Sequence, residues 1–368
     1  MPNLSLLFRK FSHRNIQLSN RIVMAPMTRS FSPNHIPTSQ VAEYYRRRAA
    51  HGVGLIITEG TCIDHPAANG YADVPFMFGY KALSGWQKVV DAVHAEGGKI
   101  IPQLWHVGAT RRAGAEPLST VPAYSPSGLA ASGRYSGRAM TQQDIQDVID
   151  SFRRAAYNAR EIGFDGVELH GAHGYLIDQF FWRDTNHRDD RYGGSIKQRT
   201  RFAREIIQAI RRDLGNNFLI VLRWSQWKIQ SFEAKLVESP DELRTFLHPL
   251  VQAGVDIFHC STRRFWEPAF PGSDLSLAGW TRRVSGLPTI AVGSVDMNRD
   301  FLGENKDSNI FTRKDILGML AQRIQNKEFD LVAVGRALIA DPAWPEKIRA
   351  GNLEEIKPFD RKSLMVLE

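Results

Sequence analysis

Eight short apolar runs alternate with amphipathic stretches along the 368 residues of this chain, and this alternation constrains the fold most. The runs are rich in β-branched residues and almost continuously apolar, as in parallel strands that are buried on both faces. They cover residues 22–26, 54–58, 99–104, 166–169, 219–223, 257–260, 289–292 and 331–334. Helical spacing of apolar residues marks stretches 39–51, 84–96, 141–163, 195–214, 240–253 and 312–327.

Eight strands that alternate with helices over this length predict an α/β fold, a single (β/α)₈ TIM barrel domain spanning residues 1–368. A doubly wound sheet is the alternative, and it would need a glycine-rich phosphate-binding turn after an early strand. The first strand instead ends in Ala25-Pro26-Met27-Thr28. Stretches 61–80, 110–140 and 296–312 are longer than a simple connection between a strand and a helix needs. In a barrel, such extended loops are expected at the catalytic face.

Composition narrows the class of protein. With 43% hydrophobic and 23% charged residues and no apolar run of membrane-spanning length, the chain is expected to be cytoplasmic, without a membrane partner. The two cysteines, Cys62 and Cys260, support neither a disulfide framework nor a metal site, and are expected to be reduced, half-buried thiols. The net charge of +8 is dispersed, which favours solvated helix faces and steering of anionic cofactors over a nucleic-acid surface.

Polar and glycine residues recur where the predicted strands end, and a barrel gathers those ends around one mouth. These residues are Pro26, Thr28, Gly60, Gln103, Trp105, His170, His173, Tyr175, Arg223, His259, Ser261, Gly293, Ser294, Gly335 and Arg336. Two histidines can hold an oxygen that gains negative charge, and a phenol can give a proton to a neighbouring carbon. A reductase of polarised C=C bonds needs both, opposite a hydride source.

The histidines also allow other readings. His170 and His173 could be structural, or zinc ligands at i, i+3 spacing. No Glu stands between them as in a His-Glu-x-x-His site, and no third ligand is evident. Metal binding is therefore not expected.

Several motifs in a fixed order carry a family resemblance from Leu7 to about Asp360. They are Asn20-Arg-Ile-Val-Met-Ala-Pro-Met-Thr-Arg29, Gln103-Leu-Trp-His106, His170-Gly-Ala-His-Gly-Tyr-Leu176, Asp190-Arg-Tyr-Gly-Gly-Ser195 and Val334-Gly-Arg336. The chain resembles the Old Yellow Enzyme family of FMN-dependent ene-reductases. Together the motifs make the match specific, where any one alone would be weak.

The resemblance implies an FMN site. Thr28 would bond flavin O4, Gln103 would read the amide edge of the pyrimidine, and Arg223 would lie near flavin N1. Other residues would pack against the isoalloxazine or hold the phosphate. The packing residues would be Pro26, Met27 and Gly60, with His170 also touching the cofactor, and the phosphate residues would be Gly293, Ser294, Gly335 and Arg336.

The resemblance also implies a two-step cycle in which NADH or NADPH reduces the flavin and an α,β-unsaturated carbonyl compound then oxidises it. His170 and His173 would bind the carbonyl oxygen, Tyr175 would protonate Cα, and Trp105 would shape the substrate pocket. Small enones, maleimides and nitroalkenes are the expected substrate classes. After the fifth strand, Trp224-Ser-Gln-Trp-Lys228 departs from the family's Ser-Pro pattern, so the conformation of loop 224–239 stays open, as does the oligomeric state.

Other functions remain in view. One is an FMN-dependent, tRNA dihydrouridine synthase-like enzyme, which the positive charge favours. It would need a catalytic cysteine and a helical RNA-binding domain, and neither Cys62 nor Cys260 falls in a suitable loop. A flavin-free phosphate-binding lyase barrel leaves Thr28 and Gln103 without a task. A non-catalytic flavin-binding protein would not need Tyr175.

Overall fold

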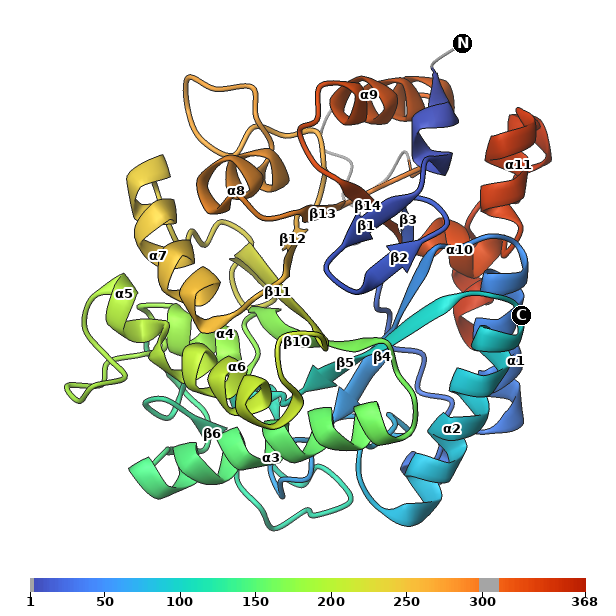
Figure 1. Ribbon diagram of the computed structural model, residues 1–368. Coiled ribbons are helices and arrows are strands. Elements are labelled where there is room, and N and C mark those ends of the chain that lie inside the picture. The colour runs from blue at the N-terminus through green and yellow to red at the C-terminus, as the bar shows by residue number, and fades with distance from the viewer. Residues whose placement is uncertain (1–2, 298–310) are drawn as a thin grey trace.

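The computed structural model describes residues 3–297 and 311–368, in which eight parallel strands close into a barrel (Figure 1). Each strand pairs with its sequence neighbour, and two further pairs, β14 with β3 and β5 with β10, complete the ring. The strands are β3 (Ile22–Met24), β4 (Leu55–Cys62), β5 (Lys99–Trp105), β10 (Gly166–His173), β11 (Leu219–Lys228), β12 (Ile257–Ser261), β13 (Thr289–Val292) and β14 (Leu331–Val334). The predicted (β/α)₈ barrel is confirmed.

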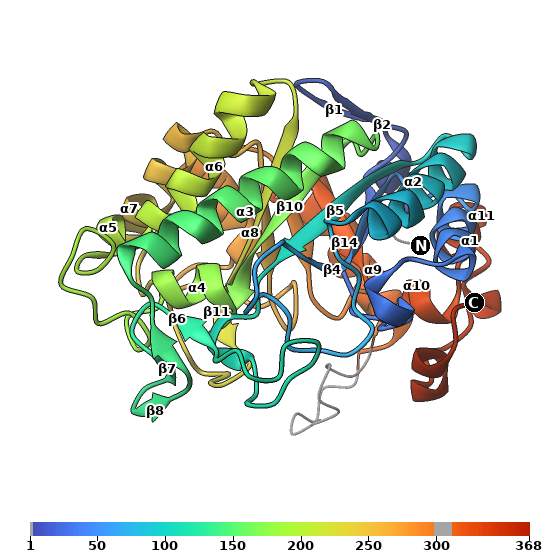
Figure 2. The same cartoon turned by 90° about the horizontal axis from the view of Figure 1, so that it is seen from below.

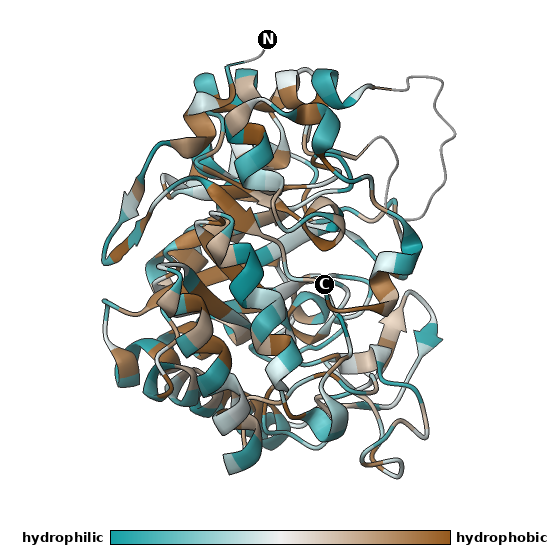
Figure 3. Ribbon diagram, turned by 90° about the vertical axis from the view of Figure 1, so that its right-hand side faces the viewer, coloured by the Kyte–Doolittle hydropathy of each residue, from teal (hydrophilic) through white to brown (hydrophobic). Residues whose placement is uncertain are grey.

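Helices surround the barrel, and Figure 3 shows hydrophobic residues on the barrel strands and a mixture of hydrophobic and hydrophilic residues on the helices. They are α1 (Ser39–Ala50), α2 (Tyr80–Ala95), α3 (Gln142–Glu161), α4 (Leu176–Phe181), α5 (Ile196–Arg199), α6 (Arg201–Leu214), α7 (Pro240–Ala253), α8 (Leu277–Ser285), α9 (Arg313–Gln325), α10 (Arg336–Ala340) and α11 (Trp344–Ala350). Short 3₁₀ turns are η1 (Leu4–Phe8), η2 (Pro33–His35), η3 (Gly108–Thr110), η4 (Leu353–Glu355) and η5 (Arg361–Met365).

Helix boundaries follow local capping. Thr141 and Asp144 form the capping box that starts α3. The single helix predicted over 195–214 is wrong in one respect, because the chain breaks at Thr200 into α5 and α6. The Thr200 hydroxyl donates to the Lys197 carbonyl at 2.7 Å and so competes with the helical backbone bonds. None of the helices that the structure describes is long and apolar enough to cross a membrane.

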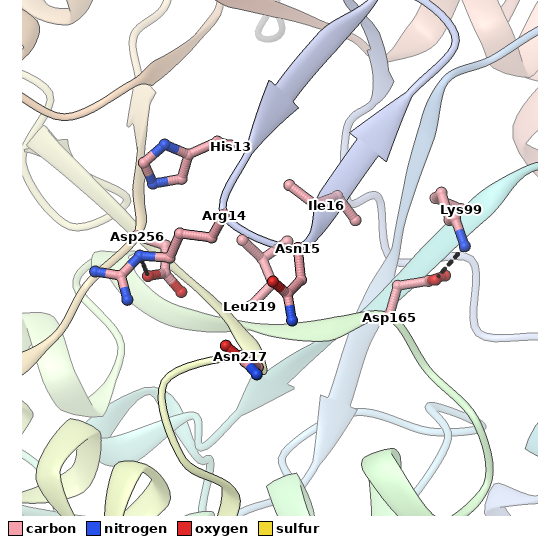
Figure 4. Close-up of a pocket in the computed structure, with 9 residues that line it drawn as sticks. All are labelled: His13, Arg14, Asn15, Ile16, Lys99, Asp165, Asn217, Leu219 and Asp256. Carbon is pink, nitrogen blue, oxygen red and sulfur yellow. Dashed lines mark ion pairs between the residues drawn. The ribbon is translucent and has the colours of Figure 1, made fainter.

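A hairpin closes the N-terminal end of the barrel. Its strands are β1 (Phe11–His13) and β2 (Ile16–Leu18), which pair antiparallel. Phe11, Ile16 and Leu18 pack in one cluster with inward-facing residues of the barrel strands. The polar pocket of Figure 4 lies at this end, where Arg14 pairs with Asp256 at 2.7 Å. Ligand binding at the barrel mouth therefore has to use the opposite end.

The extended loops lie at that opposite end. Figure 2 shows β6, β7 and β8 far from the β1–β2 hairpin. The stretch 110–140 forms short strands β6 (Tyr124–Ser125), β7 (Leu129–Ala131), β8 (Arg134–Tyr135) and β9 (Arg138–Ala139). Loop 61–80 starts later than expected because β4 continues to Cys62, and loop 224–239 starts later because β11 continues to Lys228. Most of the predicted loop 296–312 lies outside the described residues.

Two smaller features concern single residues. Cys62 and Cys260 are free thiols, but they are fully buried rather than half-buried as expected. The C-terminal tail lies against Arg29, whose Nη2 donates to the carbonyls of Ser363 at 3.0 Å and Val366 at 2.6 Å. Arg29 directly follows Thr28, so the tail is fastened beside a predicted flavin contact.

Candidate active site

The two histidines lie inside strand β10, and the expectation that they follow the strand is wrong. β10 runs to His173, four residues beyond the predicted end. Its pairing with β11 shifts register between Gly171 and His173, and His173 has a φ of 65°. Bulges of this kind re-aim side chains, and a positive φ is unfavourable for a residue with a Cβ. Sequence patterning misses this extension because the residues are polar.

Polar contacts hold His173 in that conformation. Its backbone N–H donates to Ser225 Oγ at 3.0 Å, and its Nε2 lies 2.7 Å from Ser261 Oγ. The ring stacks on Trp227 with centroids 4.4 Å apart. Trp227 belongs to the stretch that departs from the family pattern, and it was not predicted as a site residue.

The structure brings the predicted substrate residues together in one aromatic cluster. The His170 ring lies 5.1 Å from the His173 ring and 4.9 Å from the Tyr175 ring, measured between centroids. Trp105 contacts Tyr175 edge-on, with centroids also 4.9 Å apart. All four side chains are buried. The cluster combines two imidazoles with one phenol, as the chemistry inferred from the sequence requires.

Electrostatics keep the histidines neutral. Burial lowers the pKa of His170 and of His173 well below its ordinary value, and the nearby Arg223 charge lowers both further. A neutral imidazole carries one N–H donor, and His170 Nδ1 is buried without a partner among the described residues. The pair can therefore offer hydrogen bonds to a ligand oxygen without competing as acids.

The phenol of Tyr175 keeps its proton. Burial raises its pKa well above the ordinary value, and the neighbouring Tyr71 raises it further. The Tyr71 hydroxyl lies 3.2 Å from the Tyr175 hydroxyl, and its ring stacks on Trp105 with centroids 5.1 Å apart. Tyr71 lies in loop 61–80 and was not predicted. No local sequence signal marks it, because its partner is 104 positions away.

A buried carboxylate organises the barrel end beneath the cluster. Glu168 Oε1 accepts a hydrogen bond from Gln103 Nε2 at 2.7 Å, and Glu168 Oε2 lies 2.6 Å from His259 Nδ1. The Gln103 amide has a defined orientation, because its nitrogen donates to Glu168. His259, one of the residues at the predicted strand ends, thus helps to hold this carboxylate in place. Glu168 was not predicted as a site residue. A signal was present, because a Glu two residues before His170 in an apolar strand lies on the same face of the strand as His170.

Arg223 places a positive charge in this region. Its Nη2 donates to Ser261 Oγ at 3.2 Å, and its Nε is buried without a partner in the part of the chain that the structure describes. Burial lowers the pKa of Arg223, and the Glu168 carboxylate raises it. A buried guanidinium with an open N–H suits a ligand that supplies an acceptor or negative charge. The pyrimidine edge of a flavin offers both.

Gly60 and Trp105 lie in direct contact. A Cβ on Gly60 would lie 2.3 Å from Trp105 Cε3, so only glycine allows this position of the ring. The predicted flavin contact at Gly60 thus has an additional packing role.

Three predicted cofactor residues, Pro26, Met27 and Thr28, follow strand β3. Thr28 is exposed, whereas Pro26 and Met27 are half-buried. The buried Glu59 accepts hydrogen bonds from the backbone N–H groups of Arg29 at 2.9 Å and Ser30 at 3.0 Å, which fixes the segment after Thr28.

The predicted phosphate residues follow two neighbouring strands. Gly293 and Ser294 come after β13, and Gly335 and Arg336 come after β14, which pairs with β13. Gly293 has a φ of 145°, and Ser294 has a φ of 50° with its hydroxyl donating to the Arg263 carbonyl at 2.9 Å. Strands seven and eight of a barrel are where phosphate sites commonly occur. The N–H of Arg223 that lacks a partner among the described residues fits the polar edge of FMN. The neighbouring turns after β13 and β14 fit its phosphate.

Comparisons with known proteins agree with this geometry. The model of the NADH:flavin oxidoreductase / NADH oxidase family matches residues 6–355. 12-Oxophytodienoate reductase 1 of Oryza sativa subsp. japonica is 41% identical over 349 residues, which cover 93% of this chain and 85% of that protein. A solved structure of morphinone reductase in complex with tetrahydroNAD is 30% identical, with a TM-score of 0.81, and covers 97% of this chain and 93% of that one. An old yellow enzyme homologue from Zymomonas mobilis is 26% identical with a TM-score of 0.78, covering 98% and 99%.

The fold and the site thus define a flavin-dependent oxidoreductase that uses a nicotinamide electron donor. More narrowly, the chain belongs to the NADH:flavin oxidoreductase / NADH oxidase family, the Old Yellow Enzyme family. Its cofactor is FMN. This match is to flavin oxidoreductases rather than to the RNA-modifying barrels that the net charge had kept open.

Proposed function

We propose that this protein reduces activated C=C bonds of α,β-unsaturated carbonyl compounds. The observation that carries the proposal is the buried cluster of His170, His173 and Tyr175, in which two imidazole rings lie beside one phenol. Small enones, maleimides and nitroalkenes match such a site, because each places an electronegative oxygen next to the double bond.

The proposed FMN contacts divide into three groups. Thr28, Gln103 and Arg223 would hold the polar edge of the isoalloxazine, with Pro26, Met27, Gly60 and His170 against its rings. Gly293, Ser294, Gly335 and Arg336 would hold the phosphate. When bound and reduced by NADH or NADPH, FMN supplies the hydride for the substrate Cβ. Glu168 supports this arrangement by orienting the Gln103 amide at 2.7 Å.

The histidines would stabilise charge on the substrate oxygen. Each neutral ring can direct one N–H to the carbonyl, and the buried surroundings strengthen both hydrogen bonds. Loss of one preorganised donor of this kind typically costs about 3 kcal/mol of transition-state stabilisation. The contact of His173 with Ser261 at 2.7 Å and its stacking on Trp227 would keep its ring in place.

Tyr175 would protonate the substrate Cα. Its raised pKa keeps the proton on the phenol at neutral pH, so the group is ready to act as an acid. Trp105, which packs edge-on against Tyr175, would limit the substrate poses that bring Cα to the hydroxyl.

Tyr175→Phe tests the proposal because it removes the hydroxyl and keeps the ring. Reduction by NADPH should be unchanged, whereas enone-driven oxidation should slow by about 100-fold or more, the usual contribution of a general acid. Stopped-flow absorbance of the flavin separates the two half-reactions. The matched control is Tyr157→Phe, an exposed tyrosine on α3. An unchanged oxidation rate in the Tyr175 variant would count against the proposed acid.

Substrate class and electron donor need a separate experiment. Enones, maleimides and nitroalkenes should be assayed with NADH and with NADPH as donor. If none of them reoxidises the reduced enzyme faster than oxygen does, the proposed substrate class is wrong.

A further inference from the structure

The hydroxyl of Tyr175 has one side-chain partner among the described residues, Tyr71, at 3.2 Å. Tyr71 is 38% exposed, whereas Tyr175 is 7% exposed. The two tyrosines come from different parts of the barrel, since Tyr71 lies in the loop after β4 and Tyr175 follows β10. The contact therefore joins the hydroxyl of a buried tyrosine to the hydroxyl of a tyrosine that is partly exposed to solvent.

Tyr71 is held in place by its surroundings. Its ring stacks on Trp105 with an interplanar angle of 25°, and its backbone N–H donates to Asn69 Oδ1 at 2.9 Å. Asn69 is itself buried. Since Trp105 also packs against Tyr175, one indole aligns both phenols.

Turnover creates a requirement at Tyr175. A phenol that gives its proton to a carbon is left as a phenolate, and burial strongly disfavours that charge. The proton has to be replaced before the next substrate can be protonated. His170 and Trp105 contact the Tyr175 ring, but neither is a useful proton source, because His170 is neutral and an indole N–H is not acidic.

We propose that Tyr71 relays a proton from solvent to Tyr175 after each turnover. The O–H bond of Tyr71 breaks, and its proton forms a new O–H bond on the Tyr175 phenolate. The Tyr71 oxygen then takes a proton from water or from a buffer acid, so both phenols are restored and no electrons are exchanged. This relay rests on the proposed function, because it needs Tyr175 as the donor to Cα.

Tyr71→Phe tests the relay, since phenylalanine keeps the ring stacked on Trp105 and removes only the hydroxyl. In a single turnover of pre-reduced enzyme with an enone, the oxidation rate should stay within about twofold of wild type, because Tyr175 already carries its proton. In steady-state turnover, kcat should fall by about tenfold or more, with a larger solvent isotope effect. Rising concentrations of a small buffer acid such as imidazolium should restore kcat.

The control is Tyr135→Phe, an 80% exposed tyrosine on β8, which should change neither rate. A merely structural Tyr71 would slow the single turnover as much as the steady state, without rescue by buffer, and that result would overturn the relay. So would a Tyr71 variant with wild-type kcat. If Tyr175→Phe slows oxidation while Tyr71→Phe changes nothing, only the relay fails. If Tyr175→Phe changes nothing, the proposed acid fails as well.

Discussion

Glu59 should make the free energy of unfolding of this protein depend on pH, and the substitution Glu59→Gln should remove that dependence. Its carboxyl is fully buried in β4, and burial raises its pKa from 4.5 to about 7, against the opposing effect of the Ser30 and Arg29 N–H groups. The folded protein thus binds this proton more tightly than the unfolded chain does. The stability contributed by this carboxyl is complete below pH 4.5 and is lost as the pH rises through 7.

The magnitude follows from the two pKa values. The shift from 4.5 to about 7 at roughly 1.4 kcal/mol per pKa unit amounts to about 3.5 kcal/mol, most of it between pH 5 and 8. Urea unfolding of the wild type and of Glu59→Gln at pH 5, 6, 7 and 8 isolates this contribution, because other titrating groups cancel in the difference. The wild type should lose roughly 2 to 3 kcal/mol more than the variant across that range.

Glu354→Gln, which alters an exposed carboxyl in η4, is the matched control and should show a flat difference. A flat difference for Glu59→Gln would refute the reasoning. It would mean that the N–H groups of Arg29 and Ser30 compensate fully for the burial of the charge.

Three further changes have defined outcomes. Gly60→Ala, which places a Cβ 2.3 Å from Trp105 Cε3, should lower stability by about 1–3 kcal/mol in thermal unfolding, whereas Gly318→Ala at an open position of α9 should not. Asp178→Asn leaves the buried ammonium of Lys228 without its ion-pair partner at 2.7 Å and should cost about 3–5 kcal/mol in urea unfolding; a loss below 1 kcal/mol would contradict this. Glu168→Gln should weaken FMN binding about tenfold or more in flavin fluorescence titration, and an unchanged affinity would show that Gln103 needs no anchor.

The strands were predictable because a parallel strand covered on both faces is apolar throughout. Their ends were not. Residues beyond the predicted ends, such as Glu59, His170 and Ser225, are polar yet buried. The segment after β3 donates a backbone N–H to Glu59, and His173 of the neighbouring strand donates one to Ser225. A run of apolar residues in the sequence therefore ends before these positions, although the strand continues. The short helix α8 was missed because nine residues contain too few turns to show periodicity.

The motifs named candidate residues from separate strands, and the structure places His170, His173, Tyr175 and Trp105 in one cluster. The partners of the site residues could not be predicted. Glu168 meets His259 from 91 positions away, and Tyr71 meets Tyr175 from 104 positions away. Such contacts depend on how the barrel closes and how its loops fold, neither of which leaves a local trace in the sequence. Trp227 was not predicted for another reason. It lies in β11, but the departure of residues 224–228 from the family's Ser-Pro pattern left the conformation of this stretch open.

The attachment of the tail to Arg29 bears on how this protein can change by mutation. Arg29 donates to the main-chain carbonyls of Ser363, Leu364 and Val366, and residues 364–366 are exposed, Met365 most of all at 76%. These hydrogen bonds do not depend on which side chains the tail carries. The tail can therefore change in sequence, or accept engineered surface residues, while its path beside the segment proposed to contact the flavin is retained. A proline that redirects the backbone would be the exception, because it would pull the carbonyls away from the guanidinium.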